Sequence, residues 1–228
     1  MSETDFYAGY GAWKNYETPS LKAKHIAQLD RDVWRPAQMR ADHTVLEIGC
    51  GTGQVLAYLA HKGVRDFVGI DQDPKLAEVI PASARGHFIA TPVEKFLAED
   101  SRSFDRILMF DVLEHFSPSL GAELLKLLRA RLKPEGALVI KLPNMSSPWG
   151  MQHQFGDLTH RAAYTPGSLR QLCASCGYDE VACHAQITGS PFRRLADPLV
   201  HRLFGRLIMT PPEIWSANFI AVVHRGGI

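Results

Sequence analysis

The chain has 228 residues, 46% apolar and 21% charged, with a formal net charge of +1. A chain of this length can bury one full core, so we expect a single domain over residues 1–228, and the balanced charge gives no reason to expect a nucleic-acid partner. The chain does not open with a basic segment followed by an apolar run, and no apolar segment is long enough to cross a bilayer, which predicts a cytoplasmic protein.

Helical and strand patterns alternate along the chain. Apolar residues at helical spacing predict a first helix between Ser20 and Met39. Buried strands are then predicted over 44–48, 67–70, 86–90, 105–110 and 137–142. Helices are predicted between them over 55–61, 75–80, 93–99 and 120–132, the last one closed by residues 133–136. After a long loop, a helix over 166–176 and two closing strands over 181–187 and 218–224 complete the pattern. Such alternation predicts an α/β fold with a parallel sheet covered on both faces.

Three glycines, Gly49, Gly51 and Gly53, follow the first strand. Their GxGxG spacing differs from the GxGxxG of dinucleotide sites, which disfavours a nicotinamide enzyme. Asp71 ends the second strand, where a carboxylate accepts hydrogen bonds from ribose hydroxyls. Together these features predict a site for a nucleoside without a pyrophosphate. For the glycines alone, a tight corner without a ligand is the alternative.

Four segments, in this order, resemble motifs of the class I methyltransferases that use S-adenosylmethionine: VLEIGCGTG, GIDQDP, SFDRILMFDVLEHF and RLKPEGALVIKLPN. The resemblance implies a Rossmann-like sheet of seven strands, mostly parallel, with helices on both faces and an antiparallel last strand. It also implies that S-adenosylmethionine is the cofactor. Residues 1–40 would form an N-terminal lid and helix, residues 41–143 the cofactor-binding core, and residues 144–228 the acceptor-side loop and C-terminal part.

The same resemblance assigns cofactor contacts to the glycine turn. Gly49, Cys50, Gly51 and Gly53 would approach the methionine part of the cofactor. Glu47 would hold its ammonium group, directly or through water.

Further contacts follow for the ribose, the adenine and the methionyl end. Asp71 would accept hydrogen bonds from the ribose hydroxyls, Gln72 would flank the adenine, and Asp111 would lie near the methionyl end. Many relatives have an Asp before the helix that follows the third strand, whereas this chain has Pro92 there. Adenine recognition would therefore use backbone groups around Pro92 and Val93.

Methyl transfer to an alcohol requires loss of the hydroxyl proton, and histidine is the usual general base near neutral pH. His115 follows the fourth strand at the carboxyl edge of the sheet, where open parallel sheets bind ligands. We therefore predict a catalytic role for His115. The alternative is that Glu114 and His115 only cap and orient the following segment.

The loop that follows Pro143 carries the polar run QHQFGDLTHRAAYT. His153, Asp157 and His160 in this run could serve as a base or as metal ligands, or Asp157 and Thr159 could be ordinary turn and capping residues. We favour His153 or His160 as catalytic groups that contact the acceptor, without a metal. Further acceptor contacts are predicted for Tyr10, Asn144, Asp157, Arg161 and Tyr164.

The stretch DLTHRAAYTPGSLRQLCASCGY resembles a pattern of methyltransferases in bacterial surface-polysaccharide and related glycan pathways. This resemblance implies O-methylation of a sugar, a glycan or another small-molecule hydroxyl. The alternatives are an N- or C-methyltransferase of a small metabolite such as a quinone precursor, and a cofactor-binding protein without catalysis.

The two ends of the chain have two interpretations each. Aromatic residues of the first segment either close over the cofactor as a lid or dock permanently on the sheet; they are Phe6, Tyr7, Tyr10, Trp13 and Tyr16. Residues 191–209 alternate apolar clusters with arginines. We favour a core-facing or homodimer-facing helix there over a helix that lies on anionic lipid.

Overall fold

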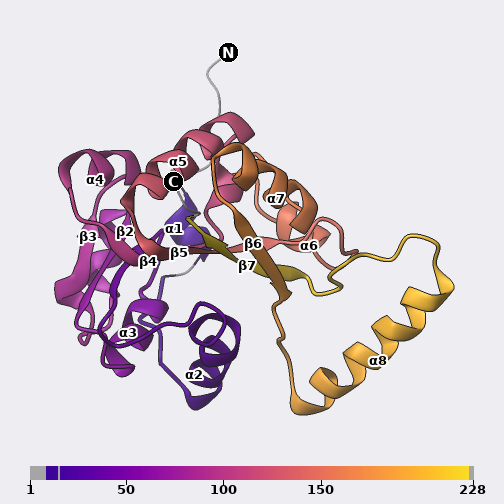
Figure 1. Cartoon of the computed structure of the whole chain (residues 1–228). Helices are drawn as coiled ribbons and strands as arrows, with labels where there is room; N and C mark the ends of the chain where they lie inside the picture. Colours follow the sequence, from indigo (N-terminus) through magenta and orange to yellow (C-terminus); the bar gives the residue numbers. More distant parts are fainter. Residues whose placement is uncertain (1–8, 15, 226–228) are drawn as a thin grey trace.

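The computed structural model describes residues 9–14 and 16–225, with only the backbone given at Tyr10, Ala12, Pro191 and Arg193. Seven strands form one sheet in the order β3-β2-β1-β4-β5-β7-β6 (Figure 1). The strands are β1 Thr44–Ile48, β2 Asp66–Asp71, β3 Phe88–Ala90, β4 Phe104–Phe110, β5 Leu132–Pro143, β6 Glu180–Ala185 and β7 Asn218–His224. β7 pairs antiparallel with both β5 and β6, whereas the pairs among β1 to β5 are parallel. The predicted sheet with its antiparallel last strand is confirmed.

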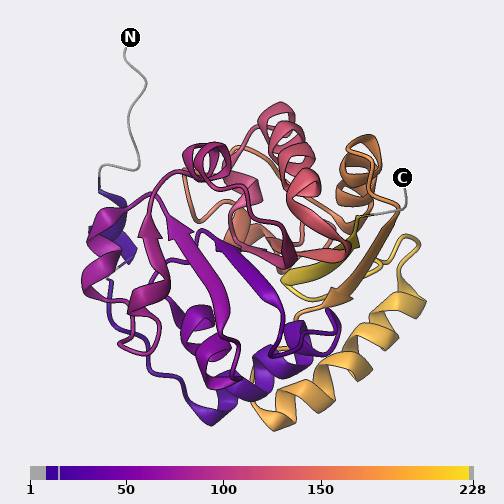
Figure 2. The same cartoon turned by 60° about the vertical axis from the view of Figure 1, so that its left-hand side comes forward.

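Helices cover both faces of this sheet (Figure 2). The α-helices are α1 Tyr10–Lys14, α2 Ala23–Leu29, α3 Gln54–His61, α4 Val93–Glu99, α5 Pro118–Arg131, α6 Met151–Gln154, α7 Pro166–Ser175 and α8 Pro191–Leu207. Short π- or 3-10 helices are η1 Asp30–Trp34, η2 Pro74–Glu78, η3 Arg85–His87 and η4 Leu113–His115. Apolar residues of α4, α5 and α7 pack on one face, and those of η1 and α3 pack on the other.

The central strands are mostly apolar because each of their faces is covered, with Glu47 of β1 and Arg106 of β4 as buried polar exceptions. In β1, Leu46 belongs to the α4–α5–α7 core, whereas its neighbour Val45 belongs to the η1–α3 core. Both side chains are fully buried. Alternate residues of a strand point to opposite faces, so a strand between two helical layers has no polar face.

Local geometry differs from the sequence-based expectation at two places. The helix expected over 75–80 is the short 3-10 helix η2, entered through Asp73, whose carboxylate accepts a hydrogen bond from the amide of Lys75. The turn expected over 133–136 is part of β5, which shifts its register against β4 between the pairs at Phe104 and Arg106. The shift forms an irregularity that accommodates Pro134, which has no amide hydrogen to donate to a neighbouring strand.

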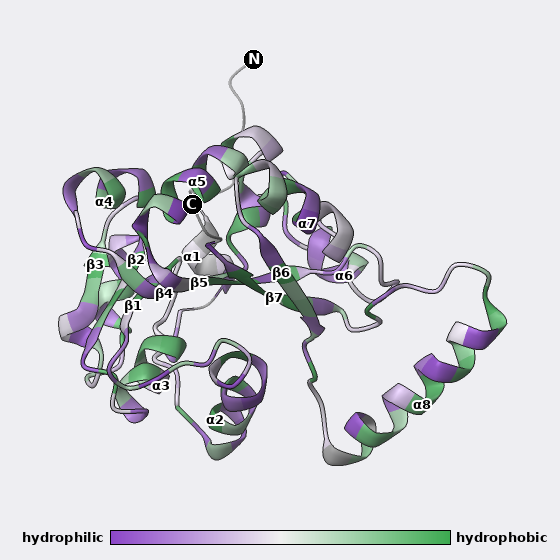
Figure 3. Ribbon diagram, viewed as in Figure 1, coloured by the Kyte–Doolittle hydropathy of each residue, from purple (hydrophilic) through white to green (hydrophobic). Residues whose placement is uncertain are grey.

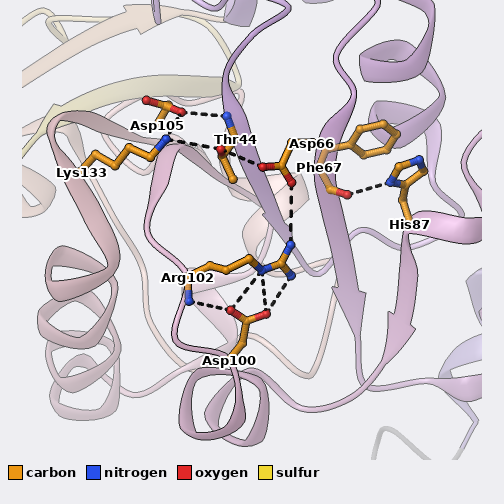
Figure 4. A network of polar contacts seen from close by, with 8 residues as sticks. All are labelled: Thr44, Asp66, Phe67, His87, Asp100, Arg102, Asp105 and Lys133. Atoms are coloured by element: carbon orange, nitrogen blue, oxygen red, sulfur yellow. Dashed lines mark hydrogen bonds and ion pairs between the residues drawn. The ribbon is translucent and has the colours of Figure 1, made fainter.

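The amino edge of the sheet is held by polar contacts (Figure 4). Asp105 accepts hydrogen bonds from the amide of Thr44 at 2.8 Å and from Lys133 Nζ at 2.7 Å. The hydroxyl of Thr44 donates to Asp66 at 2.9 Å. These contacts join the first residues of neighbouring strands, at the edge opposite the glycine turn, so we assign them a structural role.

The helix α8 stands away from the two layers (Figure 1). It lies in the segment between β6 and β7, and its large apolar side chains are exposed, Phe192 by 78% and Leu195 by 72%. The core-facing interpretation of residues 191–209 is therefore wrong, because these large apolar side chains face solvent and belong to neither core. In the described part of the chain, no helix has the length and apolarity needed to span a membrane.

Candidate active site

The glycine turn lies between β1 and α3, and its three glycines have different surroundings. Gly49, Gly51 and Gly53 all have positive φ, of 66°, 52° and 80°. A methyl group at Gly49 would collide with Val112, and one at Gly53 would lie 2.8 Å from Cδ1 of Ile80. At Gly51 it would meet no described atom within 4 Å. Gly49 and Gly53 are therefore explained by packing, whereas Gly51 faces open space.

Asp71 is fixed beside this space. Its carboxylate accepts hydrogen bonds from the amide of Gly51 at 3.0 Å and from the amide of Asp73 at 3.1 Å. Burial raises the pKa of Asp71, and the hydrogen bonds from Asp73 and Gly51 offset part of that effect. A carboxylate has about four acceptor sites, so Asp71 retains capacity for the hydroxyls of a ribose.

Glu47 lies in the same region and is only 4% exposed. Its Oε2 atom has no hydrogen-bond partner in the described part of the chain. Burial, followed by the charge of Asp71, raises the pKa of Glu47 well above its usual range. Buried carboxylate oxygens are normally paired, so this orphaned atom fits the ammonium group that the sequence assigns to it.

The other predicted cofactor residues surround the same strand ends. Cys50 is buried, and its amide donates to the carbonyl of Ile70 in β2. The amide of Thr91 donates to the carbonyl of Asp71 at 2.7 Å. This bond brings the segment with Pro92 and Val93 next to β2, with Pro92 exposed and Val93 buried. Gln72 is exposed beside Asp71.

Tyr16 was expected only as one of several lid aromatics, and the structure gives it a defined partner. Burial and then the charge and hydrogen bond of Asp73, with a further contribution from Asp71, raise the pKa of Tyr16 to about 12. The described part of the N-terminal segment therefore covers the end of β2. Phe6 and Tyr7 fall outside the described residues, and so does the side chain of Tyr10.

A cleft of about 360 Å³ lies at the carboxyl ends of β4 and β5. Residues from five parts of the chain line it, including Trp13, Lys14, Asp111, Glu114, His115, Lys141, His153, Asp157, His160 and Asn218. Asp111 has a positive φ of 54° and forms an ion pair with Lys141. The structure thus brings together the three histidines predicted to act on the acceptor.

His115 is oriented by a chain of two polar residues. The hydroxyl of Thr159 donates to Asp157 at 2.5 Å and lies 2.9 Å from Nδ1 of His115. Because the hydroxyl proton is directed to Asp157, Nδ1 of His115 is the donor and the imidazole lone pair lies on Nε2. Burial, then the proximity of His160, lowers the pKa of His115, so His115 is neutral at pH 7. Sequence reasoning identified Asp157 but saw Thr159 only as a turn residue.

His160 has the same tautomer for a similar reason. Its Nδ1 lies 2.8 Å from the carbonyl oxygen of Gln154, which only accepts hydrogen bonds, so the lone pair is again on Nε2. The rings of His115 and His160 meet edge to face, with centroids 4.7 Å apart. His153 is more exposed and lies on α6 at the margin of the cleft.

Glu114 is completely buried among the cleft residues. Neither of its carboxylate oxygens has a hydrogen-bond partner in the region that the structure describes. Burial, followed by the charge of Asp111, raises the pKa of Glu114 to about 8. The following helix α5 is capped by Ser117, whose hydroxyl accepts from the amide of Leu120. The capping interpretation of Glu114 and His115 is therefore not needed to explain α5.

Three predicted acceptor contacts lie outside the cleft lining. Asn144 is buried, and its amide donates to the carbonyls of Ile214 and Ser216 at 2.7 and 3.1 Å. Tyr164 is buried in the core beside α5. Arg161 is exposed, and its amide donates to the carbonyl of Glu114. This geometry assigns Asn144 and Tyr164 to structure, because their side chains are enclosed by protein.

Relatives of known sequence include the ubiquinone biosynthesis O-methyltransferase of Xanthomonas campestris, 30% identical over 63% of this chain and 62% of that protein. A mitochondrial ubiquinone biosynthesis O-methyltransferase of Arabidopsis thaliana is 33% identical over 43% of this chain and 32% of its own. An uncharacterized methyltransferase of Mycobacterium avium is 34% identical over 62% of this chain and 55% of its own. The chain covers less than two thirds of the length of each of these relatives.

Solved structures with the same fold include a SAM-dependent methyltransferase from Archaeoglobus fulgidus, with a TM-score of 0.67 at 19% identity over 96% of this chain and 99% of that one. The plantazolicin methyltransferase BpumL, in complex with a monoazolic desmethylPZN analog and SAH, has a TM-score of 0.63 at 19% identity over 96% of this chain and 89% of that one. The family model described as a methyltransferase domain matches residues 22–182. This match covers most of the chain, and the protein therefore belongs to the methyltransferase domain family.

Proposed function

We propose that this protein transfers a methyl group from S-adenosylmethionine to a hydroxyl oxygen of a sugar, a glycan or another small polar molecule. The observation that carries the proposal is the open space at Gly51, which adjoins the fixed carboxylate of Asp71 and the orphaned oxygen of Glu47. The family to which the chain belongs and the complex of BpumL with SAH support the same cofactor.

The chain has a group for each polar part of the cofactor. Asp71 accepts the ribose hydroxyls, and Glu47 accepts from the ammonium group. The glycine turn allows close approach at Gly51, and Tyr16 closes the outer side. When bound, the sulfonium supplies an electrophilic methyl group that an oxygen nucleophile takes by in-line displacement. The protein aligns the acceptor with that methyl group and excludes water.

The cleft supplies what an alcohol acceptor needs. A hydroxyl must lose its proton before its oxygen attacks efficiently. His115 and His160 each direct Nδ1 to an outer hydrogen-bond partner, so Nε2 is the nitrogen that can accept a proton from the acceptor, and ligand atoms of both rings and of the buried carboxyl of Glu114 lie within 4.8 Å of one another. These groups activate the acceptor hydroxyl. Thr159 and Asp157 hold His115 in the required tautomer, as positioning residues.

The lining of the cleft favours a polar acceptor. Lys14, Lys141 and Asp111 line it together with the histidines, and Trp13 adds an aromatic face. This mixture suits the hydroxyls and apolar faces of a sugar. The second candidate is a phenolic quinone precursor, which is favoured by the two relatives named as ubiquinone biosynthesis O-methyltransferases.

The test supplies the purified protein with methyl-labelled cofactor and, in separate reactions, nucleotide sugars, glycan extracts and phenolic quinone precursors. Mass spectrometry should show the gain of one labelled methyl on oxygen in the sugar or glycan reactions. His115→Gln should abolish the gain, whereas the matched control His87→Gln should not, because His87 stacks on Phe67 (Figure 4) and does not line the cleft. Label on phenols alone would select the second candidate, and label on nitrogen, or none, would refute O-methylation.

A further inference from the structure

Three side chains in the cleft, Glu114, His115 and His160, each offer a ligand atom, and these atoms all lie within 4.8 Å of one another. We propose that this triad binds a divalent transition-metal ion that holds the acceptor oxygen. The proposal rests on the proposed function in one respect, the identity of the acceptor group as a hydroxyl. It departs from the metal-free site that the sequence favours, and it makes the two imidazoles ligands of the metal in place of the bases that activate the hydroxyl in a metal-free site.

The buried and unpaired carboxyl of Glu114 is the first reason to propose a metal site. Its side chain is completely buried, and neither carboxylate oxygen has a hydrogen-bond partner among the described residues. A buried carboxyl group without partners is costly in free energy. Glu114 belongs to the cleft lining, and one of its oxygens lies within 4.8 Å of a ligand nitrogen of each of the two imidazoles. A metal ion would therefore satisfy a group that the protein alone leaves unpaired.

The outer hydrogen bonds of the two histidines are the second reason. Metal-binding histidines usually donate their other ring N–H to a carbonyl or carboxylate, which fixes the tautomer and the ring orientation. Here Nδ1 of His160 donates to the carbonyl of Gln154, and Nδ1 of His115 donates to Thr159, which in turn donates to Asp157. Both rings are thus prepared to offer Nε2 as a ligand.

The ligand set indicates the class of metal. Two imidazoles and one carboxylate suit zinc, iron(II) or manganese(II), whereas calcium and magnesium prefer sites built of oxygen atoms. Three protein ligands leave coordination positions open toward the cleft, as catalytic sites require. A hydroxyl bound at such a position is acidified, so its proton passes to water in the cleft and its oxygen remains to attack the methyl carbon.

The test uses the full-length protein after treatment with EDTA. Calorimetric titration with Zn²⁺, and visible spectroscopy with Co²⁺, should show one specific site per chain. Glu114→Gln and His160→Gln should each weaken Zn²⁺ binding by at least about 100-fold, and Thr159→Val by about 10-fold through its outer hydrogen bond. His153→Gln is the matched control, since His153 lines the same cleft outside the triad, and it should bind Zn²⁺ like the wild type.

Circular dichroism and binding of S-adenosylhomocysteine verify that each variant is folded with an intact cofactor site. Equal Zn²⁺ binding by His160→Gln and the wild type would overturn the metal site, as would no binding by a wild type that still binds S-adenosylhomocysteine. Zn²⁺ binding at the triad without methyl transfer to any hydroxyl would instead count against the proposed function alone.

A second proposal concerns the outer face of α8. Phe192, Leu195, Leu199, Leu203 and Leu207 recur every three or four residues, so they share one side of the helix, and all are more than half exposed. The opposite side carries His201, whose ring stacks on Trp215 with centroids 5.1 Å apart and whose Nε2 accepts a hydrogen bond from the indole N–H of Trp149 at 3.3 Å. The large exposed fractions show that this apolar side faces solvent, and Figure 3 shows apolar and polar residues alternating along α8.

The charged residues of α8 indicate which kind of partner this outer face binds. Arg202 and Arg206 lie three residues after Leu199 and Leu203 and so border the apolar side, whereas Asp197 is the only acidic residue of α8. Two copies paired through this face would bring arginines together with few acidic partners. We infer that the face lies on an anionic lipid bilayer, with its leucines in the acyl boundary and its arginines at the phosphates.

Sedimentation of the full-length protein with vesicles of phosphatidylcholine and phosphatidylglycerol tests this inference. Binding should require the anionic lipid, weaken with salt, and be lost in Leu199→Ser/Leu203→Ser. The matched control Leu120→Ser/Leu127→Ser changes exposed leucines of α5 and should retain binding. Absence of sedimentation would overturn the inference, and so would a dimer in solution that the α8 double variant dissociates.

Discussion

Replacement of Gly51 by alanine distinguishes a glycine that the fold requires from a glycine that cofactor binding requires. Gly51 has a φ of 52°, in the left-handed region, where a side chain other than glycine costs about 1–2 kcal/mol. The new methyl group would meet no described atom within 4 Å, so this strain is the whole expected loss of stability. The methyl group would, however, occupy the space assigned to the cofactor. We expect at least a tenfold loss of affinity for S-adenosylhomocysteine, equivalent to about 1.4 kcal/mol.

Gly63 provides the matched control. Its φ is 76°, and a methyl group there also meets nothing within 4 Å. It follows α3 at the end remote from the glycine turn. Urea unfolding should show that Gly51→Ala and Gly63→Ala lose similar stability, whereas calorimetry should show that only Gly51→Ala loses affinity. Wild-type affinity in Gly51→Ala would refute the reasoning, because the open space would then not be the cofactor site.

Three further outcomes are expected. Tyr16→Phe should weaken S-adenosylhomocysteine binding several-fold in calorimetry, because it removes the hydrogen bond to Asp73 that closes the site; unchanged affinity would contradict the lid. Arg106→Met should lower the free energy of unfolding by about 2–4 kcal/mol, because the buried guanidinium donates to several backbone carbonyls. The exposed control Arg102→Met should lose less than about 1 kcal/mol. Burial tends to raise the pKa of Asp105, but hydrogen bonds from Lys133 and Thr44 hold it below 3.8; this stabilisation is therefore present above pH 4 and lost as the pH falls through the lowered pKa. The stability deficit of Lys133→Met should accordingly shrink below pH 4 in urea titrations, and a constant deficit would contradict the assignment.

The sheet could be predicted from the sequence because its strands are buried on both faces. Runs such as residues 137–140 contain only apolar side chains, and the glycines and prolines between the strands mark the turns. The register shift within β5 could not be predicted, since it depends on how Leu132 of β5 pairs with Phe104 of the separate strand β4. The exposure of α8 also had no local signal, because its amphipathic pattern is the same whether it faces a core, a partner or a membrane.

The candidate site was partly predictable for a similar reason. Motif spacing placed Asp71 and His115 at the correct edge of the sheet, because strand ends follow directly from strand positions. The roles of Thr159 and Tyr16 depend on residues distant in sequence, His115 for the first and Asp73 for the second. Asn144 shows the opposite case. It was predicted to contact the acceptor, whereas its side-chain amide holds a neighbouring loop segment inside the protein.

The central claim is that the backbone at Gly51 and the carboxylates of Asp71 and Glu47 together hold the adenosyl cofactor. A crystal structure with S-adenosylhomocysteine tests it most directly. We expect the ribose hydroxyls within hydrogen-bond distance of Asp71, the amino group next to Glu47, and the ligand in the space at Gly51. A ligand bound elsewhere, with that space filled by protein, would contradict the claim.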